Sequence, residues 1–470
     1  MYKGNKLTKQ PNIVLIIADT LRKDSLSVYN KNINTKNINN LGNDSVIYNN
    51  AIAPSSWTIP SHASLFTGTY PSEHRIHEER DVKLGDSRLS MNSIKYNTIA
   101  EILNKKGYNT LGLSENVNIP PGSGFDKGFN QYYLSKNVYS NIMKYYLLKS
   151  DLDTVHLSDI RSIKRIIKIF KLLYKDGGIS GLIRFYNLYS LFNNKQDGYY
   201  YDKGGYTTTD IIENSSFKSP FFLFLNFFEM HEPYIKKDPA GTDNELKTLF
   251  GYYNPSLNTK IRIKNEYYKR TTVFDYYIGR IINFLKLNNI YDETMIIITS
   301  DHGQELYENG YYGHGIFLTD ELIKIPLIIK YPGNIHMIKD DLISLVDIKN
   351  LILDGSISFH PHNEVVFSEI YGIHTDANFL KNYPEFYEKS KNIDIRRKAV
   401  FNKDYKMVIN QYNKIEEFKY NGKNINVSDH KEIIDEFREK LDIFIGNEKF
   451  YSWFLIAFLI FFLWFFSIFR

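Results

Sequence analysis

The stretch PNIVLIIADT, residues 11–20, carries most of the information about the fold. Its central run, Ile13–Ala18, is apolar throughout and rich in β-branched residues, which is typical of a strand buried on both faces of a parallel sheet. The run ends abruptly at Asp19. Because ligands of open α/β sheets bind just past the carboxyl ends of the strands, we expect Asp19 to lie at a ligand-binding edge.

Comparable apolar runs recur along the chain and alternate with amphipathic segments. Strands are expected near residues 110–113, 220–228, 294–299 and 325–331, and helices near residues 98–106 and 265–290. This alternation predicts an α/β fold with a mostly parallel sheet flanked by helices. Polar residues again follow two of the runs, with His231 after one and Asp301 and His302 after another.

The length of the chain indicates more than one structural unit, because 470 residues are too many for one ordinary compact core. We expect a catalytic domain over residues 10–360 and a small α+β subdomain over residues 361–447. An apolar segment follows at 450–470. Residues of about 135–215 interrupt the strand–helix alternation and are rich in Tyr, Lys and Asn, so we expect them to form an insertion.

The composition excludes several classes of site. The chain has no cysteine, which rules out disulfides, thiolate metal sites and cysteine nucleophiles. Its formal net charge of +5 is modest for this length and does not indicate a nucleic-acid partner.

The C-terminal segment predicts a membrane anchor. Residues Trp453–Phe469 carry no charge and are apolar all round, and this length is near the lower limit for a membrane-spanning helix. A buried core helix is the alternative. The N-terminus does not resemble a signal peptide, and Lys440 and Lys449 precede the apolar segment, so we expect the catalytic domain on the cytoplasmic side. The basic amphipathic segment Arg161–Lys175 fits either a membrane-surface helix or a lid on the catalytic domain.

Asp19, Asp301 and His302 form a candidate metal site. Two carboxylates and one imidazole suit a hard or borderline divalent cation. Taken singly, an Asp at a strand end is more often a turn or helix-cap residue. The joint pattern, with all three at the same edge of one sheet, favours the metal site.

The stretch SSWTIPSHASLF, residues 55–66, contains a candidate nucleophile. Pro60 suits the first turn of a helix, so Thr58 is expected just before a helix N-terminus, where backbone N–H groups and the macrodipole favour an anion. A hydroxyl beside a metal site and a helix N-terminus is suited to attack phosphate or sulfate esters. For this motif alone, Thr58 as a simple helix cap is the alternative.

Six stretches, taken together, resemble the sulfatase family of the alkaline phosphatase superfamily over roughly residues 10–410. In chain order they are PNIVLIIADTLRKDSLSVYN, SSWTIPSHASLFTGTYPSEH, GFDKGF, NFFEMHEPY, IIITSDHGQELYENGYYGHG and IKIPLIIKYPG. The resemblance implies a sulfatase-like catalytic domain. It also implies that Asp19, Asp301 and His302 are metal ligands, and that Thr58 is both the nucleophile and a neighbour of the metal.

The same resemblance implies the residues that contact substrate. His231 and His314 fall at positions that contact the ester oxygens or protonate the leaving group. Ser61 and His62 follow the nucleophile within its motif and are expected to bind substrate.

The chain departs from the family pattern at four positions. Sulfatases convert a motif Cys or Ser to formylglycine, and Thr58 is not a known substrate for that step. His62 replaces the motif Arg, Thr20 replaces the second Asp of a common pair, and Gln304 stands where an acidic residue often follows D-H-G. Because the last two changes remove carboxylates, we expect one divalent ion, with Mg, Mn, Ca and Zn all compatible.

The sequence therefore predicts a metal-dependent hydrolase or transferase that cleaves phosphate esters, chiefly diesters, through Thr58. A lipid-linked ester is the expected substrate if residues 450–470 and 161–175 bind a membrane. One alternative is a sulfate-ester hydrolase. A second alternative, from another class, is a non-catalytic, membrane-anchored binding protein on a sulfatase fold.

Overall fold

The computed structural model describes residues 10–78, 89–134, 202–235, 248, 253–361, 363–373, 390–391 and 393–446. The basic segment 161–175 and the apolar segment 450–470 lie outside these ranges, as does most of the expected insertion. Within the described ranges, no helix combines the length and the apolarity that a membrane crossing requires.

The centre of the molecule is an eight-stranded sheet with the strand order β10-β2-β9-β6-β1-β5-β3-β4. Its strands are β1 (Asn12–Ala18), β2 (Val46–Ile52), β3 (Asn109–Ser114), β4 (Gln131–Leu134), β5 (Phe221–Phe227), β6 (Thr294–Thr299), β9 (Lys324–Lys330) and β10 (Met337–Ser344). A separate pair of two-residue strands, β7 (Glu305–Leu306) and β8 (Tyr312–Gly313), lies in the loop after β6.

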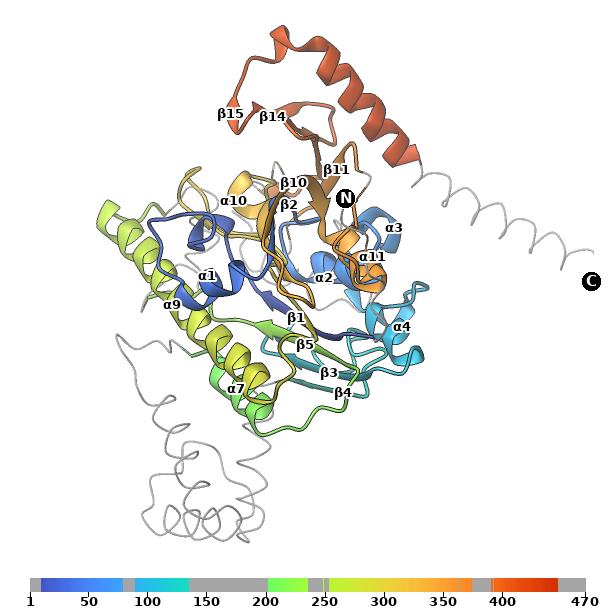
Figure 1. The fold of residues 1–470 in the computed structure, drawn as a ribbon. Coiled ribbons are helices and arrows are strands. Elements are labelled where there is room, and N and C mark those ends of the chain that lie inside the picture. The colour runs from blue at the N-terminus through green and yellow to red at the C-terminus, as the bar shows by residue number, and fades with distance from the viewer. Residues whose placement is uncertain are drawn as a thin grey trace, which may run out of the picture.

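Helices cover both faces of this sheet (Figure 1). One apolar cluster joins the sheet to α2 (Thr58–Thr67), α4 (Ile99–Lys105) and α11 (Ile348–Asp354), and the other joins it to α1 (Lys36–Gly42), α7 (Gly205–Glu213) and α9 (Leu257–Leu287). Successive residues of β1 contribute to opposite clusters, as the period of two in a strand requires. Shorter helices are α3 (Pro71–His74) and α10 (Asp320–Ile323).

The prediction of a mostly parallel sheet is confirmed. The central strand β1 runs parallel to both β5 and β6, and parallel pairing continues through β3 to β4. Parallel strands end at the same edge, so the polar residues that follow β1, β5 and β6 are brought together there.

The strand at 324–330 differs from the expectation in its direction. It runs antiparallel to both of its neighbours, β2 and β6. It includes Pro326, as the expected range 325–331 does. The register against β2 shifts between Tyr48 and Ala51, opposite the proline, so the missing N–H falls at an irregularity of the ladder.

The C-terminal subdomain is a five-stranded antiparallel sheet with one long helix. Its strands are β11 (Val366–Ile370), β12 (Arg397–Phe401), β13 (Tyr405–Asn410), β14 (Ile415–Tyr420) and β15 (Lys423–Asn424). The helix over residues 431–446 packs its apolar face, which includes Phe437, on this sheet. This agrees with the α+β arrangement expected from the sequence.

Two polar contacts hold the subdomain against the chain between β8 and β9. Arg397 donates from Nη1 to the Ile316 carbonyl oxygen at 3.3 Å, and Lys406 Nζ lies 2.8 Å from Asp320 Oδ1. Lys406, Lys324 and Lys419 hold the pKa of the Asp320 carboxyl well below its usual range, even though burial acts in the opposite direction.

Candidate active site

Asp19, Asp301 and His302 meet at the carboxyl edge of the sheet. Asp19 directly follows β1, and the other two follow β6, its neighbour in the sheet. All three side chains are fully buried, and one ligand atom from each lies within 4.8 Å of the others. The sequence reasoning that placed these three residues at one edge agrees with this geometry.

Three lone-pair atoms of this cluster have no hydrogen-bond partner among the described residues: Asp19 Oδ1, Asp301 Oδ2 and His302 Nε2. His302 Nε2 lies 3.5 Å from Asp301 Oδ2 and 3.8 Å from Asp19 Oδ1. The other ring nitrogen, Nδ1, donates to the Gly303 carbonyl oxygen at 2.9 Å, which leaves Nε2 as an acceptor. A buried polar atom without a partner costs about 1–3 kcal/mol, so three facing acceptors fit a bound cation.

The ionisation of the carboxyl groups supports the same interpretation. Burial, followed by the neighbouring Asp301 charge, raises the pKa of Asp19 to about 6, and burial raises the pKa of Asp301 to about 7. Burial also lowers the pKa of His302, so the imidazole is neutral and able to act as a ligand. Two buried carboxylates without a countercharge are unfavourable, and a divalent cation would balance them.

Thr58 lies beside this cluster as the first residue of α2. The expectation was a position just before the helix, and the structure instead makes Trp57 the N-cap and places Pro60 at the third helical position. The Thr58 hydroxyl donates to Asp19 Oδ2 at 3.2 Å. The nucleophile candidate and a metal-ligand candidate are therefore in direct contact.

Asn116 is a member of the site that the sequence analysis missed. It lies two residues after β3, and its Nδ2 donates to Asp19 Oδ2 at 2.5 Å and to Thr58 Oγ1 at 3.4 Å. Its own Oδ1 accepts from the Asn118 backbone N–H at 2.7 Å, which fixes the direction of the amide. The available signal was its place after a strand at the same edge of the sheet.

Ser61 and His62, which were expected to bind substrate, both make contacts within the protein. The Ser61 hydroxyl donates to the Ser55 carbonyl oxygen at 3.0 Å, and both side chains are fully buried. His62 Nδ1 lies 3.0 Å from the Thr58 carbonyl oxygen, and its Nε2 lies 3.1 Å from Asn226 Nδ2. Both ring nitrogens of His62 thus have partners inside the protein, and Nδ1 also lies 3.4 Å from Asp301 Oδ2, next to the metal-ligand candidates. Substrate binding by Ser61 and His62 stays a prediction.

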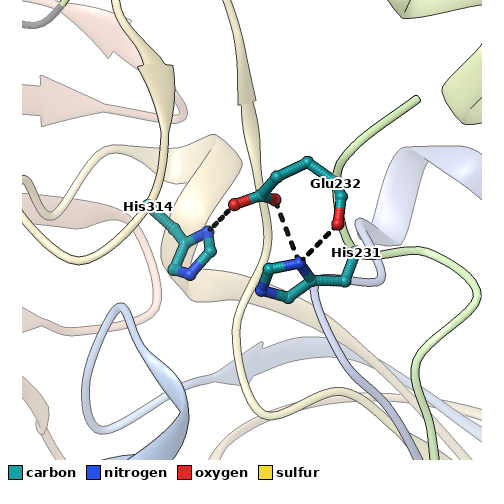
Figure 2. A group of neighbouring side chains, drawn as sticks. All are labelled: His231, Glu232 and His314. Carbon is teal, nitrogen blue, oxygen red and sulfur yellow. Dashed lines mark hydrogen bonds and ion pairs between the residues drawn. The ribbon is translucent and has the colours of Figure 1, made fainter. Parts of the chain in front are cut away.

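A second polar group lies next to the first and consists of His231, Glu232 and His314 (Figure 2). The Glu232 carboxylate lies between the two imidazoles, 3.4 Å from His231 Nδ1 and 3.7 Å from His314 Nδ1. The His314 ring centroid is 4.7 Å from that of His302, so the two groups form one continuous site. Both histidines were expected here. Glu232 belongs to the polar cluster that follows β5 in the sequence, but it was given no role, because adjacent polar residues do not reveal which of them face the site.

Glu115, which follows β3, and Glu229, which follows β5, form a carboxyl pair at the same edge of the sheet. Both side chains are fully buried. Glu115 accepts from Thr208 Oγ1 at 2.8 Å and from the Phe228 N–H at 2.9 Å, while Glu229 accepts from the Gly205 N–H at 2.9 Å. Burial and the neighbouring Glu229 charge raise the pKa of Glu115 well above its usual value. The pair therefore holds a proton and fixes the N-terminus of α7 at the edge of the sheet.

Known sulfatases resemble this chain over most of its length. The family model described as Sulfatase matches residues 11–354. Iduronate 2-sulfatase of Mus musculus is 24% identical over 377 residues, which cover 70% of this chain and 61% of that protein. Arylsulfatase of Clostridium perfringens is 25% identical over 392 residues, which cover 73% of this chain and 74% of that protein. The chain thus spans less than two thirds of the length of the mouse relative.

Solved structures share the fold. A phosphonate monoester hydrolase of Agrobacterium radiobacter superposes with a TM-score of 0.63 at 16% identity, covering 93% of this chain and 96% of that one. A 2-O GAG sulfatase superposes with a TM-score of 0.61 at 14% identity, covering 94% and 93%. At these identities the likeness shows the fold alone. Because the family model spans most of the chain and the fold agrees, the chain belongs to the sulfatase family.

Proposed function

We propose that the protein is a metal-dependent hydrolase or transferase that cleaves phosphate esters, chiefly phosphodiesters, through a covalent intermediate on Thr58. The observation that carries the proposal is the hydrogen bond from the Thr58 hydroxyl to Asp19, inside a cluster of buried acceptor atoms that fits a divalent cation. One ion held by Asp19, Asp301 and His302 would supply Lewis-acid chemistry when bound.

Each residue of the site has a separate role in this reaction. Thr58 Oγ1 attacks the phosphorus, and its proton is directed at Asp19 Oδ2, the nearest acceptor. Asn116 Nδ2, which already contacts Thr58 Oγ1, donates to the negative charge that develops beside the hydroxyl. The leaving oxygen takes a proton from the protonated imidazole of His314 or His231 as its bond to phosphorus breaks, and that imidazole regains a proton when the covalent intermediate is attacked. Attack of water or an acceptor alcohol at phosphorus releases Thr58.

Thr58 is the reason for preferring phosphate to sulfate. The formylglycine hydrate of sulfatases has a second hydroxyl that expels sulfate by elimination. Threonine has a single hydroxyl, so a sulfated Thr58 would lack this exit, whereas a phosphorylated Thr58 remains open to attack at phosphorus. The internal position of His62 supports a diester, because no cation stands where the family has Arg and a singly charged ester needs less compensation.

The competing proposal is a sulfate-ester hydrolase. It is favoured by the names of the curated relatives, which include iduronate 2-sulfatase and an arylsulfatase. The shared fold does not decide between the two, since proteins described as a phosphonate hydrolase and as a sulfatase both have it. A non-catalytic binding protein is less well supported, because the full set of Asp19, Thr58, Asp301 and His302 is held in one cluster.

Membrane attachment through residues 450–470, with the catalytic domain on the cytoplasmic side, is part of the same proposal. It rests on the apolar sequence of that segment. A membrane-bound enzyme of this class would act on lipid-linked phosphodiesters, since their ester group is presented at the membrane surface.

Rates on matched aryl phosphodiesters, phosphomonoesters and sulfate esters test the proposal, with each of Mg²⁺, Mn²⁺, Ca²⁺ and Zn²⁺. We expect phosphodiesters to react fastest, and Thr58→Ala to lose several orders of magnitude in turnover. Thr67→Ala is the matched control, because this threonine lies in the same helix and its hydroxyl donates to the Ala63 carbonyl oxygen. A faster sulfatase rate would reverse the ranking. Turnover by Thr58→Ala within about tenfold of wild type would remove Thr58 from the mechanism.

A further inference from the structure

The Gln304 side chain contacts two members of the second polar group, Glu232 and His314. Glu232 in turn contacts the third member, His231. Gln304 Nε2 donates to Glu232 Oε2 at 2.9 Å, and Gln304 Oε1 lies 2.9 Å from His314 Nδ1. The Gln304 side chain is fully buried. The residue stands where, by the family resemblance, an acidic side chain often follows D-H-G.

The partners fix which way the amide faces. A carboxylate oxygen can only accept a hydrogen bond, so the NH₂ end of Gln304 must face Glu232 and the carbonyl end must face His314. The amide carbonyl is also an acceptor, so His314 Nδ1 must carry a hydrogen. Turning the amide over would place two oxygen acceptors against each other at Glu232, at the cost of two hydrogen bonds.

The backbone of Gln304 is equally constrained. Its N–H donates to the Glu321 carbonyl oxygen at 3.1 Å, and its carbonyl oxygen accepts from Arg22 Nη1 at 3.2 Å. The preceding Gly303 lies so close to α10 that a Cβ there would be 2.0 Å from the Glu321 carbonyl oxygen. Gln304 is therefore held at both its backbone and its side chain before any substrate binds.

We infer that Gln304 is a positioning residue that keeps a hydrogen on His314 Nδ1, so that Nε2 is the atom that takes up a proton from solvent and then gives it to the leaving oxygen. The inference rests on the proposed function. Figure 2 shows the second ring nitrogen of His314 on the side of the ring away from Glu232. A neighbour that fixes one ring nitrogen of a histidine determines which nitrogen is available for chemistry.

His231 has the same tautomer by a separate contact. Its Nδ1 lies 2.9 Å from the Glu232 carbonyl oxygen, which can only accept, so this nitrogen also carries a hydrogen. The two imidazoles thus present the same nitrogen, Nε2, for proton exchange. Only His314 depends on the Gln304 side chain for this.

The alternative for this group is a second cation site, because its three side chains also offer ligand atoms within 4.8 Å of one another. The contrast with the first cluster decides against it. There the facing atoms lack partners, whereas here each Nδ1 already contacts an acceptor and Glu232 Oε2 already accepts from Gln304.

The test compares wild type, Gln304→Met, His314→Ala and the double variant on aryl phosphodiesters whose leaving groups range from dinitrophenol to phenol. Methionine keeps the shape of the side chain without its polar atoms. For Gln304→Met we expect kcat to fall about tenfold or more on the phenyl ester and little on the dinitrophenyl ester, with KM nearly unchanged, because a good leaving group needs no proton. The double variant should be no slower than His314→Ala, since Gln304 acts only through His314.

Asn309→Ala is the matched control, because Asn309 lies in the same loop and its Nδ2 donates to Glu305 and not to the site. Equal losses of kcat for all leaving groups, or losses that add in the double variant, would assign Gln304 a merely structural role. Metal analysis distinguishes the cation alternative: we expect the same single ion in wild type and Gln304→Met, and a second ion lost in the variant would overturn the inference.

A readout that needs no turnover separates this inference from the proposed function. In the full-length protein with labelled histidines, nitrogen NMR should show His314 as the Nδ1–H tautomer in wild type and as a mixture in Gln304→Met. If wild type cleaves no ester, the proposed function fails while the tautomer result still decides the role of Gln304. An unchanged His314 spectrum in Gln304→Met would refute that role.

Discussion

The side-chain amide of Asn116 donates to Asp19 Oδ2 over 2.5 Å, although 97 positions separate the two residues in the chain. This bond uses the carboxylate oxygen that also accepts from Thr58, and so it leaves Asp19 Oδ1 for the metal site. The Asn116 amide therefore orients both Thr58, the candidate nucleophile, and Asp19, the residue that accepts its hydrogen bond.

Removing this amide should impair turnover without removing the ion. We expect Asn116→Ala to lower kcat by about 10²-fold or more, in the range seen when one donor to a developing negative charge is lost. The metal content should stay at the wild-type value, since Asn116 offers the ion no ligand in this arrangement. Asn118→Ala, two residues away, is the control and should keep near-normal rates. Loss of the ion in Asn116→Ala would instead make Asn116 a metal ligand.

Removing the ion should abolish activity and lower thermal stability. A cation that binds only the folded protein raises Tm with its concentration, and chelation reverses this. We expect Asp301→Ala and His302→Ala to lose this dependence, measured by differential scanning calorimetry with and without each of the four divalent ions. His360→Ala, at an exposed histidine far along the chain, is the control. Full activity after exhaustive chelation would exclude a metal-dependent reaction.

The Glu115–Glu229 pair predicts a pH dependence of stability. The pKa of Glu115 is 4.5 in the unfolded chain and is raised well above this in the folded protein, first by burial and then by the Glu229 charge. The folded state therefore holds the proton more tightly, so this contribution is complete below about pH 4.5 and is lost as the pH rises through the raised pKa.

Glu115→Gln should remove that contribution to the slope, because the amide stays neutral at every pH. Urea unfolding of wild type and variant from pH 5 to pH 9 gives the difference, in which the titrating groups outside the Glu115–Glu229 pair cancel. We expect the variant to gain stability relative to wild type as the pH rises. Parallel curves would mean that Glu115 carries no proton in the folded state.

Membrane attachment predicts a simple effect of truncation. A chain ending at Gly446 should leave the membrane fraction and keep its activity, because every residue of the proposed site lies before that point. Ultracentrifugation of lysates separates the two forms. Protease added outside intact cells should leave the catalytic domain uncut if it is cytoplasmic. A truncated chain that still sediments with membranes would contradict the anchor.

The metal-ligand candidates that the sequence predicted share one property, which is that they follow long apolar strands. Asp19 and Asp301 interrupt runs whose burial is evident from composition alone, and parallel pairing then brings them to one edge. Asn116 follows a short strand that contains Gly112, so its neighbourhood gave no equally clear signal.

Other features depend on contacts that no local pattern encodes. The bond from Gln304 to Glu232 joins residues 72 positions apart, and each alone is an ordinary polar residue in a loop. The antiparallel direction of β9 was also hidden, because an apolar run looks the same whichever way the strand runs. His62 was placed by its motif, and only the packing of α2 revealed that its ring points inward.

The antiparallel direction of β9 limits which segments of the protein could be exchanged with those of a relative. Since β9 enters the sheet at the edge where β6 leaves it, the whole loop between them, with Gln304 and His314, stays at the active edge. Arg397 and Lys406 of the C-terminal subdomain contact this loop at the Ile316 carbonyl oxygen and the Asp320 carboxylate. A chimaera that exchanged only the C-terminal subdomain would therefore disturb the catalytic loop, and a working exchange would have to carry residues 303–323 with it.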